Sequence, residues 1–75
     1  MPYVAIKVWP KDEAIKKELV DKINQVFLDV WGCPQEAMNV SLEEIAPEDW
    51  EETVKKPEID PNVDKMMILD GQKKY

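Results

Sequence analysis

The chain has 75 residues, a formal net charge of −6, a single cysteine and no histidine. The acidic balance argues against a nucleic acid or an anionic membrane as a partner, because both attract basic surfaces. One thiol forms no internal disulfide and, without histidine, makes no zinc site, so we expect one domain over residues 1–75 that completes its small core by self-association.

The first predicted element is a strand over residues 3–9. Aliphatic β-branched residues occupy every second position, and this period of two is typical of a strand with two different faces. Pro10 ends the strand because proline has no N–H to donate. One face carries Val4, Ile6 and Val8, and the other carries Tyr3, Ala5, Lys7 and Trp9.

A long helix is predicted over residues 12–31. Asp12 is placed to cap its first turn, and Gly32 followed by Pro34 stops it. Apolar residues recur at spacings of three and four, which indicates one apolar stripe along the helix. The stripe consists of Ile15, Leu19, Ile23, Val26, Phe27 and Val30.

A turn over residues 34–37 leads to a second strand, predicted over residues 38–45 from alternating apolar and polar residues. The helix between the strands is long enough for a crossover, so the strands are expected to be parallel and paired. The predicted fold is α+β, with a β-α-β core over residues 2–50. One face of this sheet stays bare in a single chain, so a second chain is expected to cover it.

The remainder of the chain, residues 51–75, is predicted to be an irregular C-terminal tail. A short helical turn over residues 48–54 carries Trp50. Pro57 and Pro61 are expected to break the chain after that turn, because proline interrupts helical hydrogen bonding.

The last part of the tail has weaker signals. Residues 62–68 are compatible with a short helix or with a strand, and the dipeptide Asp70-Gly71 is typical of a turn. The four residues after this turn are expected to fray, as chain ends commonly do.

Few residues in the chain are suited to catalysis. Without histidine there is no serine or cysteine triad of the usual kind, and Gly32 and Gly71 form no phosphate-binding loop. Pro2 is the exception, since removal of Met1 turns its nitrogen into a secondary amine that acts as a base when burial favours the neutral form. The plain alternative is that a proline simply follows the initiator methionine.

Three segments carry a family resemblance by their order and spacing. They are residues 2–8 (PYVAIKV), residues 17–23 (KELVDKI) and residues 40–45 (VSLEEI), followed by Trp50. Together they resemble the 4-oxalocrotonate tautomerase family over residues 2 to 50. Three further stretches are most similar to its dimeric branch, the phenylenolpyruvate tautomerase type: WPK at 9–11, PEDW at 47–50 and EIDP at 58–61.

The resemblance implies a tautomerase that moves a proton between the enol and keto forms of a small-molecule acid without a cofactor. It also implies a homodimer, or a hexamer built as a trimer of dimers. Pro2 matches the family's general base and acid, and Trp50 stands at the aromatic position. Lys11 is the nearest match to a substrate-binding arginine, with a one-residue shift, and the second family arginine falls on Asn39.

These departures from the family pattern narrow the expected substrate. Lysine is a point charge rather than a planar fork, and asparagine carries no charge. A site with one cation favours a 2-keto or 2-hydroxy-enoic monocarboxylate such as phenylenolpyruvate, with Asn39 donating a hydrogen bond to the reacting oxygen. Tyr3, Trp9 and Trp50 suit an aromatic substrate tail.

The expected topology separates these residues along the sheet. Parallel strands begin at the same end, so Pro2 and Asn39 are expected to be neighbours. Lys11 lies beyond the other end of the first strand, on the order of 25 to 30 Å from Pro2 along extended chain. Trp50 follows the far end of the second strand. Lys11 and Trp50 are therefore expected to reach a Pro2 site mainly from a neighbouring subunit.

Each of these residues also has an ordinary structural explanation. Trp50 is equally a packing residue, Lys11 a solvated lysine, and Asn39 a side chain that satisfies the backbone at a strand start. Tyr3 fits an interface as well as a pocket. Two acidic pairs, Glu43-Glu44 and Glu48-Asp49, are interpreted as solvated faces and not as metal ligands.

Two other functions stay open. The same proline supports hydration, dehalogenation or decarboxylation in relatives that add an acidic residue to activate water, and no such residue stands out here. A non-catalytic interaction module on the tautomerase scaffold is the other alternative, and the missing second arginine favours it.

The sequence also predicts a location. No apolar run approaches the roughly 20 residues of a membrane-spanning helix. Residues 1–7 lack the basic and apolar regions of a signal peptide. Together with a free cysteine, these features indicate a cytoplasmic protein.

Overall fold

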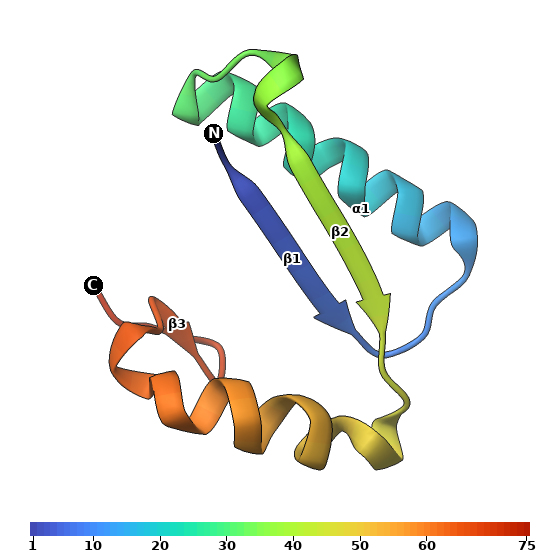
Figure 1. The fold of residues 1–75 in the computed structure, drawn as a ribbon, viewed down its shortest axis with the longest axis vertical. Coiled ribbons are helices and arrows are strands. Elements are labelled where there is room, and N and C mark those ends of the chain that lie inside the picture. Colours follow the sequence, from blue (N-terminus) through green and yellow to red (C-terminus); the bar gives the residue numbers. More distant parts are fainter. The chain divides into compact units, whose positions relative to one another are not determined.

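Two parallel strands, β1 (Tyr3–Val8) and β2 (Asn39–Glu44), form the central sheet in the computed structural model, which describes residues 1–75. Their register runs from Tyr3 opposite Asn39 to Val8 opposite Glu44, and both strands begin at the same end (Figure 1). Beyond the last pair, the Ile45 N–H donates to the Val8 carbonyl at 2.8 Å. The predicted parallel pairing is confirmed, with each strand slightly shorter than expected.

The two faces of this sheet differ in exposure, as the alternation of side chains predicts. Tyr3 is 71% exposed and Trp9 is 55% exposed, and Ala5 between them is exposed too. The open face is therefore the one that the sequence leaves bare in a single chain. The other face is half-buried and carries Val4, Ile6, Val8, Val40 and Leu42.

Helix α1 (Glu13–Val26) connects the strands and continues through a wider π-helical turn over Phe27–Trp31. The Asp12 side chain caps the helix by accepting a hydrogen bond from the Ile15 N–H at 2.9 Å. Gly32 ends it at φ 80°, where a residue without Cβ is favoured. The predicted helix is confirmed in extent, but its last turn is wider than an α-helix because the Gly32 N–H bonds back to the Phe27 carbonyl.

The predicted apolar stripe of α1 is only partly covered. Ile23 and Phe27 are half-buried, whereas Leu19 is 39% exposed and Val30 is 83% exposed. A two-stranded sheet with strands about 4.8 Å apart is narrower than a helix of about 10 Å, so it covers only one side of α1. The exposed apolar residues, named here the outer stripe, are Ile15, Leu19, Val26, Val30 and Trp31.

The core is small for a folded chain. Only Ala37, Ile45 and Val54 are buried, and no side chain is completely buried. Ala37 belongs to a 3₁₀ turn (Gln35–Ala37) where a simple turn was predicted. A chain of this size that leaves one sheet face and the outer stripe in water has apolar surface available for association.

The chain divides into two compact units, Met1–Ile45 and Ala46–Tyr75, and the second is more regular than predicted. A 3₁₀ turn (Pro47–Asp49) leads into wide helical turns over Glu51–Ile59 and a further 3₁₀ segment over Asp60–Lys65. The expected break at Pro57 is wrong. The turns here are wider than those of an α-helix, as the bond from the Asp60 N–H to the Lys55 carbonyl shows. In a wider turn the proline ring is farther from the preceding carbonyls with which it clashes in an α-helix.

Pro61 itself lies in the first turn of the 3₁₀ segment, where its missing N–H is not needed. Asn62 directly after it leaves the helical region at φ −119° and ψ 21°, so a kink is present where the break at Pro61 was expected. The ambiguous residues 62–68 divide between this segment and the start of a strand.

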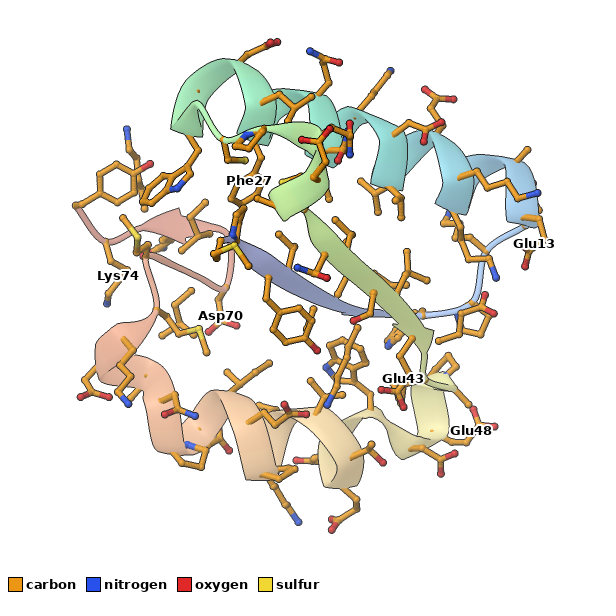
Figure 2. All side chains as sticks on the ribbon, turned by 45° about the horizontal axis from the view of Figure 1, so that its top comes forward. Glu13, Phe27, Glu43, Glu48, Asp70 and Lys74 are labelled. Carbon is orange, nitrogen blue, oxygen red and sulfur yellow. The ribbon has the colours of Figure 1, made fainter.

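A hairpin closes the C-terminal unit. Strands β3 (Ile68–Leu69) and β4 (Gln72–Lys73) are antiparallel and joined by Asp70 and Gly71, at φ 50° and 79° (Figures 1 and 2). Two successive residues with positive φ make the tight turn that suits the twist of a hairpin. The predicted turn is confirmed. The predicted fraying is wrong for β4, which pairs with β3, and the Lys74 N–H also donates to the Met67 carbonyl at 2.8 Å.

Candidate active site

Pro2 and Asn39 lie side by side at the end of the sheet where both strands begin. Asn39 is paired with Tyr3 across about one strand spacing of 4.8 Å, and Pro2 is the residue just before Tyr3, so Pro2 is diagonally adjacent to Asn39. Pro2 is half-buried, whereas Met1 before it is 95% exposed. The neighbouring arrangement expected from the topology is therefore present in the N-terminal unit.

The Asn39 side chain is oriented by the backbone just before it. Its amide nitrogen donates a hydrogen bond to the Ala37 carbonyl at 3.2 Å. An asparagine amide has two N–H groups and one acceptor oxygen, so one such bond leaves a donor and the acceptor to act elsewhere. Asn39 can therefore bond to the Ala37 backbone and still donate a hydrogen bond to the reacting oxygen of a substrate.

Lys11 lies at the opposite end of β1, after the strand has ended. Six residues of strand span roughly 20 Å, so a single chain separates Lys11 from Pro2 by the whole length of the sheet. Lys11 is exposed, and its backbone N–H donates to Oε2 of Glu44 at 3.0 Å. The side chain of Glu44, at the end of β2, therefore holds the Lys11 backbone.

Glu44 belongs to a cluster of charges that the sequence did not reveal. Nζ of Lys16 is 2.9 Å from Oε1 of Glu44 and 2.6 Å from Oε1 of Glu13. Hydrogen bonds with Glu13 and Glu44 raise the pKa of Lys16, and the bonds from Lys16 and from the Lys11 N–H lower the pKa of Glu44. Glu44 is exposed, as predicted for this acidic pair, but it also makes specific contacts with Lys16 and the Lys11 backbone.

Only part of this cluster had a signal in the sequence. Glu13 and Lys16 are three residues apart on a helix, which is a recognisable pairing distance. Glu44 joins them only because the parallel register brings the end of β2 to the end of β1. Figure 2 labels Glu13 at the start of α1 and Glu43, the neighbour of Glu44, near the end of β2.

The two aromatic candidates lie in different environments. Tyr3 projects from the open face of the sheet. Trp50 is half-buried in the C-terminal unit, between the 3₁₀ turn at 47–49 and the wide helical turns at 51–59. Each belongs to its own unit, so the sheet does not by itself bring Trp50 to Pro2.

No group of three or more His, Cys, Asp or Glu side chains is arranged to hold a metal ion. None of the helices combines the length and the apolar character required to cross a membrane.

A β-α-β unit that begins at a half-buried proline, with an amide side chain one strand away, matches a known class of enzymes. The family model described as "Tautomerase enzyme" matches residues 2–55. "Tautomerase PptA" of Cronobacter sakazakii is 31% identical over 73 residues, covering 95% of this chain and 96% of that protein. A "Probable tautomerase" of Xylella fastidiosa is 26% identical over 72 residues, or 95% and 88% of the two chains.

The chain therefore belongs to the tautomerase family. It is an isomerase with an activity of the keto–enol tautomerase type, acting on small molecules. The resemblance seen in the sequence is confirmed at the level of this family, and the α+β fold agrees with it.

Proposed function

We propose that the protein interconverts the enol and keto forms of a 2-keto or 2-hydroxy-enoic monocarboxylate such as phenylenolpyruvate, with Pro2 as general base and acid. One observation carries the proposal: Pro2 is half-buried at the start of β1, one strand from Asn39. The family match, which begins at residue 2, supports it.

The chemistry needs one group that both takes and gives a proton. In ketonisation, the 2-hydroxyl loses its proton and C3 gains one, so the overall change is a 1,3-transfer with no net consumption of acid or base. Once Met1 is removed, the Pro2 nitrogen is a secondary amine, and partial burial disfavours its charged form. A neutral amine next to the substrate performs both proton transfers in turn and needs no cofactor.

Binding of the substrate uses the remaining candidates. Asn39 donates a hydrogen bond to the oxygen on which negative charge develops, and Lys11 pairs with the carboxylate. One cation in the site favours a monocarboxylate over a dicarboxylate. Tyr3 and Trp50 line the aromatic end of the substrate.

The site requires more than one chain, because Lys11 and Pro2 lie at opposite ends of β1. We infer a homodimer, or a hexamer of three dimers, in which Lys11 of one subunit serves the Pro2 site of another. The open face of the sheet and the outer stripe of α1 offer the apolar surface that such an assembly buries.

An ultraviolet assay of phenylenolpyruvate ketonisation tests the proposal on the protein whose N-terminal proline has been verified by mass analysis. Pro2→Ala is expected to lower kcat by at least about 100-fold, the usual range for losing a general base. Pro57→Ala, which changes an exposed proline in the other unit, serves as the control with unchanged kcat. Equal rates for wild type and Pro2→Ala would remove Pro2 from the mechanism.

A non-catalytic interaction module on the same scaffold is the second candidate. The bond from the Asn39 amide to the Ala37 carbonyl favours it, since a backbone role explains Asn39 without any substrate. Mass analysis of the purified chain separates the two candidates, because a retained Met1 leaves the Pro2 nitrogen as a non-basic amide.

A further inference from the structure

The segment between β1 and α1 is held at two adjacent residues. Asp12 caps α1 through its side chain, and Lys11 donates its backbone N–H to Glu44. The two contacts come from different directions, since one is local to the helix and the other crosses 33 positions of sequence. This segment is therefore fixed to the end of β2 as well as to the helix.

The two oxygens of Glu44 have different partners. Oε2 accepts from the Lys11 N–H at 3.0 Å, and Oε1 pairs with Nζ of Lys16 at 2.9 Å. The Lys16 side chain is 16% exposed and that of Glu44 is 32% exposed, so Lys16 is the better shielded of the two. The positive charge of Lys16 partly compensates the negative charge of Glu44, which weakens the attraction of Glu44 for a further cation.

The Lys11 ammonium takes no part in this cluster, although the Lys11 backbone is bound to Glu44. Glu44 binds the backbone of Lys11, and the ion pairs of Glu44 and Glu13 are both with Lys16. Lys11 itself is exposed. Its charge is thus available to a ligand, while its backbone is fixed.

We propose that Glu44 is a positioning residue for Lys11. Glu44 anchors the backbone of Lys11, and the ion pair between Glu44 and Lys16 keeps Glu44 from binding the Lys11 ammonium. This inference rests on the proposed role of Lys11 in binding the substrate carboxylate. Glu44 contacts no reacting atom. It acts by fixing where the Lys11 side chain begins, so its loss affects substrate binding more than the proton transfer at Pro2.

The test compares steady-state kinetics of Glu44→Ala, Glu44→Gln, Lys11→Ala and the double variant Lys11→Ala/Glu44→Ala. We expect Glu44→Ala to raise KM about tenfold while kcat changes less than about twofold. Glu44→Gln keeps an acceptor of the same shape, so its rise in KM is smaller. Glu18→Ala is the matched control, because Glu18 also pairs with a lysine, Lys22 at 2.8 Å, and lies elsewhere on α1.

A second measurement does not depend on activity. Hydrogen exchange of the Lys11 amide, followed by NMR, is expected to be about tenfold faster in Glu44→Ala than in wild type, and unchanged in Glu18→Ala. This readout reports the anchoring bond directly and keeps the inference testable if one variant folds poorly.

The double variant separates this inference from the proposed function. If Glu44 acts through Lys11, Glu44→Ala adds nothing to KM once Lys11 is alanine. An equal rise in KM in both backgrounds would overturn the inference, as would an unchanged Lys11 amide in Glu44→Ala. An unchanged KM in Lys11→Ala would overturn both the role of Lys11 and this inference, and would leave the role of Pro2 to the Pro2→Ala assay.

Discussion

The two ends of the β1–β2 sheet are built differently. The end where the strands begin has Pro2 beside Asn39, whose side-chain amide donates to the Ala37 carbonyl. The end where they finish carries a cluster of charges around Glu44 and Lys16 that holds the Lys11 backbone. The first end carries the half-buried Pro2 that we propose as the base, and the other end carries the exposed Lys11, whose backbone is fixed. The comparison teaches that a single chain holds the two halves of its proposed site apart.

The largest expected effect comes from changing the Pro2 end without changing any side chain. A form with one glycine added before Pro2 keeps the proline ring but turns its nitrogen into an amide, which has no basic lone pair. We expect kcat to fall at least about 100-fold in the ketonisation assay. Activity equal to that of the protein with a free Pro2 would show that the amine is not the base.

The second effect concerns the other end of the sheet. Lys11→Ala removes a charge-assisted bond worth about 1.5–3 kcal/mol, so KM is expected to rise roughly 10- to 100-fold with a smaller change in kcat. Lys11→Arg restores binding, since its guanidinium pairs with a carboxylate in two places. Steady-state kinetics measure both variants, and a wild-type KM in Lys11→Ala would contradict the assignment.

A smaller effect is the pH dependence of the stability that Glu44 and Lys16 contribute at the end of the sheet where the strands finish. The lowered pKa of Glu44 gives stability that is complete above its ordinary value of 4.5 and is lost as the pH falls through the lowered value. The raised pKa of Lys16 gives stability that is complete below 10.5 and is lost as the pH rises through the raised value. NMR titration is expected to show Glu44 ionising below its ordinary pKa of 4.5, and a midpoint at or above that value would contradict the account.

The smallest effect tests the helix cap beside Lys11. Asp12→Ala removes the acceptor of the Ile15 N–H and is expected to lower the free energy of unfolding by about 1 kcal/mol. Asp12→Asn keeps a capping oxygen and is expected to recover most of the loss. Chemical denaturation of the two variants measures the difference, and equal stability of Asp12→Ala and wild type would contradict the role of the cap.

Much of the N-terminal unit could be predicted because its signals are local. Alternation defined β1 and β2, Asp12 and Gly32 marked the helix ends, and crossover length implied the parallel pairing that brings Pro2 to Asn39. These features depend on residues near one another in the sequence or on rules of chain connection.

The remainder depended on contacts that the sequence does not display. The specific contacts of Glu44 were not predicted because its partners, Lys16 and the Lys11 N–H, are about 30 positions away. Pro57 was expected to end a helix, but the turns around it are wide enough to include it. The apolar stripe of α1 was predicted, but not which of its residues stay exposed, because that depends on the width of the two-stranded sheet.

Mixing of two impaired variants tests the shared site most directly. Pro2→Ala and Lys11→Ala are unfolded together, refolded as a mixture and assayed for ketonisation at a substrate concentration below KM. If Lys11 of one subunit serves Pro2 of another, random assembly leaves about a quarter of the sites intact, and activity returns to about 25% of wild type. Activity no higher than the sum of the two variants would contradict a site built from two chains.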